Sequence, residues 1–361
     1  MHGPSLHDLE LEARRRLPQP VYDFLAGGAD DEVTLRANEA AFAPIGIVPR
    51  VLRACGPPKL DLTILGQRCT APILLAPTAF HCLAHPDGER ATARAAAGCG
   101  VIMITSMAST VAIEDVAAAA REANAVAAPG LWFQLYLQPD RAFTEAIIRR
   151  AEAAGCTALV ISVDSPVFGR RERDIRNGFH DLPEGLACEN LRESASPGSP
   201  VRKLVFTEVS WRDIEWLRAV TRLKIVLKGI AHPEDARLAQ AHGVDALIVS
   251  NHGGRQLDTV PAAIQLLQPI VRTIAGRIPV LVDGGIRRGT DILKAVALGA
   301  TAIAVGRPVL WGLASGGEDG VRQVLTSLKA ELARAMTLCG SRSLTELDEN
   351  LLYSPSGMRP C

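Results

Sequence analysis

Residues 246–258 read Ala246-Leu247-Ile248-Val249-Ser250-Asn251-His252-Gly253-Gly254-Arg255-Gln256-Leu257-Asp258. The first four are a short apolar run rich in branched side chains, which predicts a buried strand that ends in a polar turn. Adjacent glycines let such a turn bend sharply and approach a ligand closely. His252 can take up a proton near neutral pH, and Arg255 can hold a carboxylate through two parallel hydrogen bonds. An isolated His-x-x-Arg is more often a surface turn, but a base and an anion clamp so close together suit proton abstraction from a small acid.

The rest of the chain repeats the pattern of an apolar strand followed by a helical stretch. The strand candidates are Ile73–Ala79, Val101–Thr105, Leu131–Leu137, Ala158–Asp164, Lys224–Ile230, Ala246–Asn251, Pro279–Gly285 and Ala302–Arg307. Alanine-rich helical stretches between them include Gly88–Ala97, Ile113–Ala123, Ala142–Ala154 and Pro233–Ala241. Continuous apolar strands that alternate with helices predict an α/β fold with a parallel sheet covered by helices. Eight such strands favour a (β/α)8 TIM barrel. A doubly wound sheet is the alternative, although no Gly-x-Gly-x-x-Gly follows the first strand.

We expect one domain over residues 1–361. Residues 1–72 form an N-terminal helical cap and a β-hairpin, with helices over about 5 to 55, a cap at Ser5 and a hairpin turn at Gly66-Gln67. The barrel covers 73–314, and C-terminal helices and a tail cover 315–361. The polar interval 165–210, a long loop after strand 4, breaks the rhythm of the barrel. A segment of this length inside a compact domain is usually a functional lid or a mobile loop, so it predicts an active-site loop over the carboxyl ends of the strands.

Composition favours a soluble globular protein. The 361 residues are 48% hydrophobic and 22% charged, with a formal net charge of zero and no basic run, which gives no reason to expect nucleic acid or a membrane as partner. No stretch is apolar for long enough to cross a membrane. The eight cysteines show no Cys-x-x-Cys pair and no zinc-ligand spacing, so we expect reduced thiols in a cytoplasmic protein and no metal. Neither the polar N-terminus nor the final Met358-Arg359-Pro360-Cys361 resembles a secretory or peroxisomal address.

Barrel active sites lie at the carboxyl ends of the strands, so polar residues at these ends are the candidates. They are Pro77, Thr78, Ala79, Thr105, Ser106, Gln134, Tyr136, Ser162, Asp164, Lys228, Ser250, His252, Asp283, Arg287, Gly306 and Arg307. Any one of them is more often structural than functional. Eight strands that all end in polar or small residues predict a site.

The ends of the last two strands carry the features of a phosphate site. Asp283-Gly284-Gly285-Ile286-Arg287 and Gly306-Arg307 supply glycine N–H groups, a helix N-terminus and arginines, which many barrels use to hold a phosphate. The phosphate of a substrate or the tail of a flavin would serve equally well.

Three further charged features have both a functional and a structural interpretation. Lys228 ends an apolar strand, where an unpaired ammonium would be costly, so it faces an anion or ring edge, or forms a Schiff base as in an aldolase. Asp164 could hold the tautomer of His252 or cap the turn at Ser165-Pro166. The charged run Gly169–Asp174 could supply a second carboxylate clamp or form a solvated face. We assign no role to His81.

The whole pattern resembles the FMN-dependent 2-hydroxy acid oxidases and dehydrogenases, a family that includes glycolate oxidase, lactate oxidase and mandelate dehydrogenase. Ser-Asn-His-Gly-Gly-Arg-Gln at 250–256 is similar to the signature of this family. The resemblance runs from about Val21 to the end of the chain. It includes Val21–Phe24 with Gly27–Ala29, Ala76–Ala79, Ala84–Pro86, Trp132–Tyr136, Val163–Pro166 with Gly169–Arg171, Lys228-Gly229, Asp283–Arg287 and Gly306–Pro308.

The resemblance implies a role for each matching residue. His252 takes the proton of the substrate hydroxyl with Asp164 as partner, Tyr136 hydrogen-bonds at the reacting centre, and Arg255 and Arg171 hold the carboxylate. The backbone at Pro77, Thr78 and Ala79 approaches the flavin. The flavin's remaining contacts are Thr105, Gln134, Ser162, Lys228 and Ser250 at the ring, and Asp283, Gly284, Gly285, Arg287, Gly306 and Arg307 at the ribityl chain and phosphate. FMN itself supplies the redox chemistry.

Two departures from the glycolate-type members bear on the substrate. Phe24 stands where they have a tyrosine whose hydroxyl helps to bind the carboxylate, and Met107 stands where they have a tryptophan. Both changes resemble the long-chain and aromatic 2-hydroxy acid oxidases, and methionine adapts to varied shapes. We therefore expect medium-chain, long-chain or aromatic substrates to be preferred over glycolate.

The expected reaction is oxidation of an L-2-hydroxy acid to the 2-oxo acid with reduction of O2 to H2O2, as by an (S)-2-hydroxy-acid oxidase. The alternative within the family is a dehydrogenase that passes electrons to a quinone or cytochrome. Its membrane-bound members carry an apolar segment where Gly185–Lys203 is polar, which favours oxygen as acceptor. A flavin-free phosphate-binding barrel, such as a Schiff-base aldolase, is the alternative from another class.

The family resemblance also implies a homo-oligomer, a tetramer or octamer.

Overall fold

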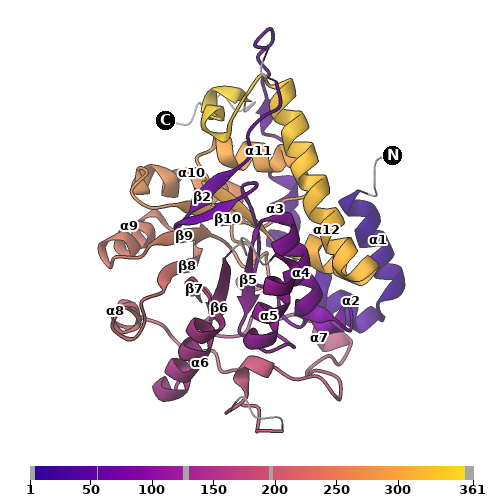
Figure 1. The fold of residues 1–361 in the computed structure, drawn as a ribbon, viewed down its shortest axis with the longest axis vertical. Coiled ribbons are helices and arrows are strands. Elements are labelled where there is room, and N and C mark those ends of the chain that lie inside the picture. Colours follow the sequence, from indigo (N-terminus) through magenta and orange to yellow (C-terminus); the bar gives the residue numbers. More distant parts are fainter. Residues whose placement is uncertain (1–4, 55, 125–129, 195–197, 354–361) are drawn as a thin grey trace.

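The computed structural model describes residues 5–54, 56–124, 130–194 and 198–353, and it confirms the predicted (β/α)8 barrel (Figure 1). Eight parallel strands close in the order β10-β11-β4-β5-β6-β7-β8-β9. They are β4 (Ile73–Leu75), β5 (Ile102–Ser106), β6 (Leu131–Leu135), β7 (Ala158–Ser162), β8 (Lys224–Ile230), β9 (Ala246–Val249), β10 (Val280–Asp283) and β11 (Ala302–Val305). We call the end of the barrel at which these strands terminate its mouth.

Side chains that alternate along each strand build two cores. On β7, Ala158 and Val160 point into the barrel and join its interior cluster, whereas Leu159 and Ile161 face the surrounding helices and join the outer cluster. All four are fully buried. Full burial of a Val, Leu or Ile side chain contributes about 1.5–3 kcal/mol, so both faces of the strand must be apolar. This explains why the strands appear in the sequence as unbroken apolar runs.

Most strands end earlier than the sequence predicts. The first, third and fourth predicted strands extended to Ala79, Leu137 and Asp164, but ladder pairing stops at Leu75, Leu135 and Ser162. Beyond these points the chain leaves the sheet and turns out over the mouth, although its residues remain partly apolar. An apolar pattern in the sequence indicates burial and not backbone pairing, so it could not predict where these strands end.

Helices surround the barrel and cover its outer face (Figure 1). They are α1 (Leu6–Arg16), α2 (Gln19–Ala26), α3 (Val33–Ala40), α4 (Gly88–Cys99), α5 (Ile113–Ala123), α6 (Arg141–Ala154), α7 (Glu172–Arg176), α8 (Trp211–Val220), α9 (Pro233–Ala241), α10 (Ala263–Ile274), α11 (Gly289–Ala297) and α12 (Arg307–Leu338). Ser5 caps α1 as predicted, because its Oγ accepts a hydrogen bond from the N–H of Asp8 at 3.2 Å. The helix α12 is kinked at Gly316 and Gly317, next to the predicted boundary at 314, and its first part lies beside α1.

The prediction of helix up to residue 55 is wrong. Helix α3 ends at Ala40, and the chain then forms the short strand β1 (Gly46–Ile47), which pairs with β12 (Leu352–Tyr353) near the other end of the chain. Pro44 and Pro49 lie on either side of β1, and proline cannot continue a helix.

The predicted hairpin is present as β2 (Leu62–Ile64) and β3 (Gln67–Cys69). Its turn lies at Leu65-Gly66, one position before the predicted Gly66-Gln67, and both turn residues have positive φ. Ile64 and Cys69 are fully buried within the interior cluster of the barrel. Because the hairpin precedes β4, it closes the barrel at the end opposite the mouth.

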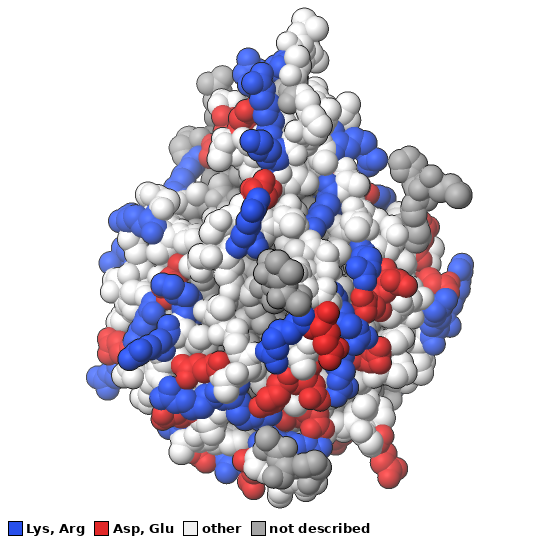
Figure 2. Space-filling view, in the orientation of Figure 1, with Lys and Arg blue, Asp and Glu red and all other residues white. Residues whose placement is uncertain are grey.

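The interval after β7 is more ordered than a plain loop. It contains α7 and the short 3-10 helix Glu189–Leu191 before α8 begins. Residues 195–197 of this interval lie outside the described residues, as do the terminal segments 1–4 and 354–361. Within the described ranges, the six cysteines are free thiols, and no helix is both long and apolar enough to cross a membrane. The face in Figure 2 shows acidic and basic side chains interspersed.

Candidate active site

His252 and Asp164 meet at the mouth of the barrel although they come from different loops. The Nδ1–H of His252 donates to Asp164 Oδ1 at 3.0 Å, and the hydroxyl of Ser165 donates to the same oxygen at 3.1 Å. The phenol oxygen of Tyr136 lies 3.4 Å from Nε2 of His252. These bonds assign the proton to Nδ1 and leave the Nε2 lone pair facing Tyr136. The arrangement orients the imidazole of His252, and the catalytic role expected for the pair stays a prediction.

Backbone geometry at two glycine positions makes this approach feasible. Gly229 has φ +105° and lies in a register irregularity of β8, and a Cβ there would come within 2.5 Å of Asp164 Cγ. Irregularities of this kind often re-aim strands beside active sites. His252 itself adopts φ 58°, and at Gly254 a Cβ would come within 2.6 Å of the backbone nitrogen of Leu35. The glycines therefore let the His252 turn pack against the N-terminal helices.

Electrostatics keep His252 neutral and Asp164 charged. Burial lowers the pKa of His252 below its ordinary value, while the charge of Asp164 acts in the opposite sense. Burial alone would raise the pKa of Asp164, but His252 and Lys228 together outweigh it and lower that pKa to about 2. Burial also raises the pKa of Tyr136, so its hydroxyl stays protonated. At neutral pH the group is therefore a free imidazole base beside a carboxylate and a phenol.

Polar side chains follow the mouth from β5 round to β10 in the order of the strands. Gln134 Nε2 donates to Ser162 Oγ at 3.2 Å, and Lys228 Nζ donates to Ser250 Oγ at 3.0 Å. Lys228 also pairs with Asp283 at 3.2 Å. In parallel strands, neighbours in register share one level, so these groups form a continuous rim.

Lys228 is a charged group of this rim. It is 4% exposed, and burial would lower its pKa, but the carboxylates of Asp283 and Asp164 raise it overall. A Schiff-base lysine must lose its proton to attack a carbonyl, which requires a lowered pKa. The ion pair therefore favours the anion-facing interpretation of Lys228 over the aldolase interpretation.

Several buried polar atoms around the mouth have no hydrogen-bond partner. They are Thr105 Oγ1, Asp164 Oδ2, Arg171 Nε, Asp283 Oδ1 and Arg287 Nε. A buried polar group without a partner costs about 1–3 kcal/mol. The unpaired atoms include N–H donors on the arginines and acceptor oxygens on the carboxylates. The site therefore fits a bound group that carries both nitrogen and oxygen atoms, such as a flavin with its ribityl chain.

The two predicted clamp residues, Arg171 and Arg255, which we call the arginine pair, both lie near the ring of Phe24. Their guanidinium carbons are 5.8 and 5.1 Å from the centre of the Phe24 ring. Arg255 Nη1 also donates to the carbonyl oxygens of Phe24 and Gly27 at 2.8 and 2.9 Å. Burial lowers the pKa of Arg171 to about 8, and the charge of Arg255 adds to this effect. The pair is thus a concentrated positive charge that an anion would stabilise.

The side chains of Arg287 and Arg307 are bound by the N-terminal helices in this structure. Arg307 donates to the carbonyl oxygens of Ala26, Gly27 and Gly253 at 2.7 to 3.1 Å. Arg287 pairs with Glu39 at 2.6 Å. Both line an outer groove of about 640 Å³ that does not include His252. The guanidinium of Arg307 is therefore already occupied, which differs from its predicted side-chain contact with a phosphate.

Met107 does not join the site surface. Its side chain is 0% exposed and packs in the outer core, and its backbone N–H donates to Gln134 Oε1 at 3.3 Å. The prediction that Met107 shapes the substrate pocket is therefore not supported by its position, because the apolar pattern cannot tell a pocket wall from a core.

Aromatic rings from the loop after β7 surround the site, and sequence reasoning missed two of them. Phe179 packs on Phe24 with ring centres 4.9 Å apart, and Phe206 packs edge-on against Tyr136 at 5.1 Å. Phe80 also stacks on Phe24, with ring centres 5.6 Å apart. Phenylalanines inside an otherwise polar interval are the signal that could have revealed them.

His81, which received no role from the sequence, supports Thr78. His81 Nε2 lies 2.7 Å from Thr78 Oγ1, and Nδ1 lies 2.9 Å from Thr92 Oγ1. The histidine is 2% exposed, and burial lowers its pKa, so it is neutral. His81 therefore fixes the hydroxyl of Thr78, which belongs to the segment Pro77–Ala79 that we expect to approach the flavin.

A barrel whose mouth collects an oriented His–Asp pair, a buried arginine pair and a polar rim has the architecture of a flavin-dependent oxidoreductase. The family model of the FMN-dependent dehydrogenases matches residues 13–354, and the chain belongs to this family. FMN is accordingly its cofactor. Within the described residues, no group of three or more His, Cys, Asp or Glu side chains is placed to hold a metal ion.

Named relatives cover nearly the whole chain. A peroxisomal (S)-2-hydroxy-acid oxidase of Oryza sativa subsp. japonica is 48% identical over 95% of this chain and 94% of its own. The 2-hydroxyacid oxidase 2 of Homo sapiens is 46% identical, covering 96% of this chain and 97% of its own. Among solved structures, mandelate oxidase with benzoyl-formic acid is 44% identical with a TM-score of 0.87 and covers 97% of both chains.

Proposed function

We propose that this protein oxidises an L-2-hydroxy acid to the corresponding 2-oxo acid and passes the electrons to O2, as an (S)-2-hydroxy-acid oxidase does. The observation that carries the proposal is the 3.0 Å bond between His252 and Asp164 in a mouth that also holds the arginine pair. The names of the relatives described above are those of oxidases of this class. Two electrons and two protons leave the substrate, and O2 takes them up as H2O2.

His252 acts as the general base. Its Nε2 takes the proton of the substrate's α-hydroxyl, because its other nitrogen is already committed to Asp164. Asp164 stabilises the imidazolium that results, and its low pKa keeps it ionised throughout. Tyr136 donates a hydrogen bond at the reacting centre, since its hydroxyl lies beside Nε2. The three residues together hold and move one proton.

Arg255 and Arg171 bind the substrate carboxylate. Two guanidinium groups offer planar donors that match a carboxylate in geometry and charge. A bound anion would also offset the burial and the charge of Arg255, which together lower the pKa of Arg171. The carboxylate therefore both fixes the substrate and neutralises a charge that the fold leaves uncompensated.

The polar rim holds FMN, which supplies two-electron acceptance from the α carbon when bound. Pro77, Thr78 and Ala79 approach the ring through their backbone, and Thr105, Gln134, Ser162 and Ser250 supply hydrogen-bonding groups. Lys228, paired with Asp283, would place positive charge at the flavin ring. The ribityl chain and phosphate would be held by Asp283, Gly284, Gly285, Arg287, Gly306 and Arg307. Arg307 would act through its backbone N–H at the first turn of α12, because its guanidinium is bound by three carbonyl oxygens.

The substrate side chain is medium-chain, long-chain or aromatic. Phe24, with Phe80 and Phe179 stacked on its ring, forms an apolar cluster beside the arginine pair. Each methylene buried there contributes about 0.8 kcal/mol. One missing tyrosine hydrogen bond costs about 1 kcal/mol, so a few carbons of side chain more than offset it. This argument rests on the phenylalanines alone, since Met107 is in the core.

Two measurements test the proposal. Purified protein should be yellow, and anaerobic addition of mandelate should bleach the flavin band. In air, each 2-oxo acid formed should be matched by one H2O2. Turnover that needs an added quinone or dye would instead identify a dehydrogenase. A colourless protein that cannot be reconstituted with FMN would remove the proposal altogether.

We extend the proposal to a homo-oligomer and a cytoplasmic location, following the same family resemblance. Sedimentation of the purified holoenzyme tests the first. A mass equal to the 38.4 kDa monomer would contradict it.

A further inference from the structure

We propose that Glu32 and Arg173 are positioning residues that hold the arginine pair, Arg171 and Arg255, at the spacing a substrate carboxylate needs. The inference rests on the proposed function, because it takes the arginine pair as the carboxylate clamp. It assigns a role to two residues that the sequence analysis passed over.

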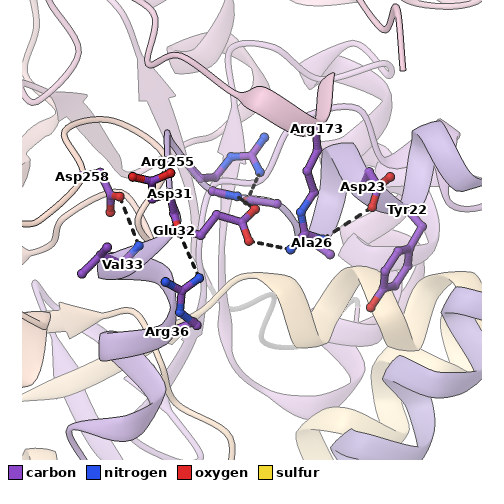
Figure 3. Close-up of polar contacts among 12 residues, drawn as sticks. Tyr22, Asp23, Ala26, Asp31, Glu32, Val33, Arg36, Arg173, Arg255 and Asp258 are labelled. Carbon is purple, nitrogen blue, oxygen red and sulfur yellow. Dashed lines mark hydrogen bonds and ion pairs between the residues drawn. The ribbon is translucent and has the colours of Figure 1, made fainter. Parts of the chain in front are cut away.

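The two residues form an ion pair between the N-terminal extension and the loop after β7. Glu32 lies in the turn between α2 and α3, and its Oε2 is 2.5 Å from Nη2 of Arg173 on α7. Arg173 also lies 3.5 Å from Asp23 on α2. Figure 3 shows the Glu32 carboxylate pointing at the guanidinium of Arg173, with Asp23 beyond it. The Glu32 side chain is 14% exposed, so water screens the pair only in part.

On the side of α7, this ion pair fixes the position of Arg171. Arg171 is the residue that precedes α7, and Arg173 belongs to the first turn of that short helix. Asn177 just after the helix donates to Asp23 at 2.8 Å, so α7 is tied to the N-terminal extension at both ends. Any tilt of α7 would move Arg171, because only one residue separates it from Arg173.

On the side of the N-terminal extension, Glu32 fixes the position of Arg255. The second oxygen of Glu32 accepts a hydrogen bond from the N–H of Gly28 at 2.9 Å. The neighbouring Gly27 carbonyl accepts Nη1 of Arg255 at 2.9 Å. A Cβ on Gly28 would come within 2.8 Å of the carbonyl oxygen of Gly254, so this turn and the Arg255 turn are in direct contact. One carboxylate therefore links both members of the arginine pair.

The arginine pair needs such a link because its own charges oppose it. Arg171 Nε has no partner, and its nearest carboxylate, Asp174, is 3.9 Å away. Within the described residues neither arginine has a carboxylate closer than 3.9 Å, so the two cations repel each other and would separate if their backbones were free. Glu32 also adopts φ 58°, a conformation that non-glycine residues keep only where their surroundings hold them. Its two bonds supply that restraint.

Glu32→Gln and Arg173→Met each break the ion pair that joins the N-terminal extension to α7. The glutamine oxygen can still accept from Gly28 but has no charge for Arg173, and the methionine removes the same ion pair from the other side. Each should raise the Kd of oxalate, measured by flavin absorbance on the oxidised holoenzyme, about 10-fold, the effect of losing one charge-assisted contact. The KM for the hydroxy acid should rise in parallel, while kcat stays within about twofold. The double variant should be no worse than either single one, because both remove one interaction.

Glu172→Gln is the matched control, since Glu172 lies on the same helix and its ion pair, at 2.6 Å, is with the exposed Arg170. It should leave the Kd of oxalate unchanged. FMN content and thermal unfolding are measured for every variant, and Arg173→Met carries the test if Glu32→Gln fails to retain FMN.

Arg255→Lys separates this inference from the proposed function. If Arg255→Lys leaves oxalate binding unchanged, the arginine pair is not the clamp and the proposed function loses its support there. If Arg255→Lys weakens oxalate binding but Glu32→Gln and Arg173→Met do not, the clamp stands and the positioning role is overturned. An equal effect of Glu172→Gln would also overturn it.

Discussion

The Nδ1 atom of His252 lies 3.0 Å from Oδ1 of Asp164, and the two residues are 88 positions apart in the chain. The bond joins the loop after β9 to the loop after β7, and it leaves the second imidazole nitrogen directed at Tyr136. This one contact sets the tautomer and the direction of the His252 imidazole, whereas burial keeps the ring neutral.

Replacement of His252 by alanine should leave FMN bound and reduce turnover. General-base catalysis is worth roughly 10²- to 10⁴-fold. The rim contacts of Gln134, Lys228 and Asp283 do not use the His252 side chain, so the groups proposed to hold FMN stay in place. Rapid mixing under anaerobic conditions should show a proportionally slower bleaching of the flavin band. A variant isolated without FMN would show that His252 is structural.

The pH profile of kcat/KM should rise to a plateau whose acid limb lies below the ordinary histidine pKa of about 6.5. The base must be neutral to accept a proton, and burial lowers the pKa of His252. The carboxylate of Asp164 raises that pKa, so Asp164→Asn should move the acid limb to still lower pH while lowering the plateau. Stopped-flow rates of flavin reduction between pH 4 and pH 9 would check both shifts. An acid limb that moves upward in Asp164→Asn would contradict the assigned pairing.

Lys228→Met should weaken FMN binding and lower the melting temperature of the apoprotein. The change leaves Asp283 as a buried carboxylate without its cation, and breaking a buried pair costs about 3–5 kcal/mol. Replacing both residues, as in Lys228→Met with Asp283→Leu, should recover much of the stability but not the FMN affinity. Calorimetry and flavin titration would separate the two effects. Trapping of a carbonyl substrate on the native protein by borohydride would instead revive the Schiff-base alternative.

Phe24→Tyr should shift specificity towards glycolate. The added hydroxyl lies beside the arginine pair and can offer about 1 kcal/mol of hydrogen bonding to a carboxylate, which helps every substrate but matters most for one without a side chain. A series from glycolate to 2-hydroxyoctanoate and mandelate, run on both proteins, gives the comparison in kcat/KM. Should glycolate already be the best substrate of the native enzyme, the argument from the phenylalanine cluster is wrong.

The sequence determined the architecture. Unbroken apolar runs alternating with alanine-rich stretches specify a parallel barrel, because each strand is buried on both faces. Once the barrel is known, polar residues just after the strands must meet at its mouth. His252, Asp164 and Lys228 could therefore be placed there without coordinates. Their types and the glycines beside them, together with the family resemblance, indicated the chemistry.

Tertiary structure decided which of these groups touch and which face away. Glu32 and Arg173 are 141 positions apart and carry no local pattern, so only the packing of α7 on the N-terminal extension reveals their contact. The burial of Met107 and the three carbonyls around Arg307 likewise depend on side-chain direction, which periodicity does not encode. Local sequence specifies burial and backbone freedom. Contacts between loops are set by how rigid elements pack, and a residue's own neighbours in the chain do not specify that packing.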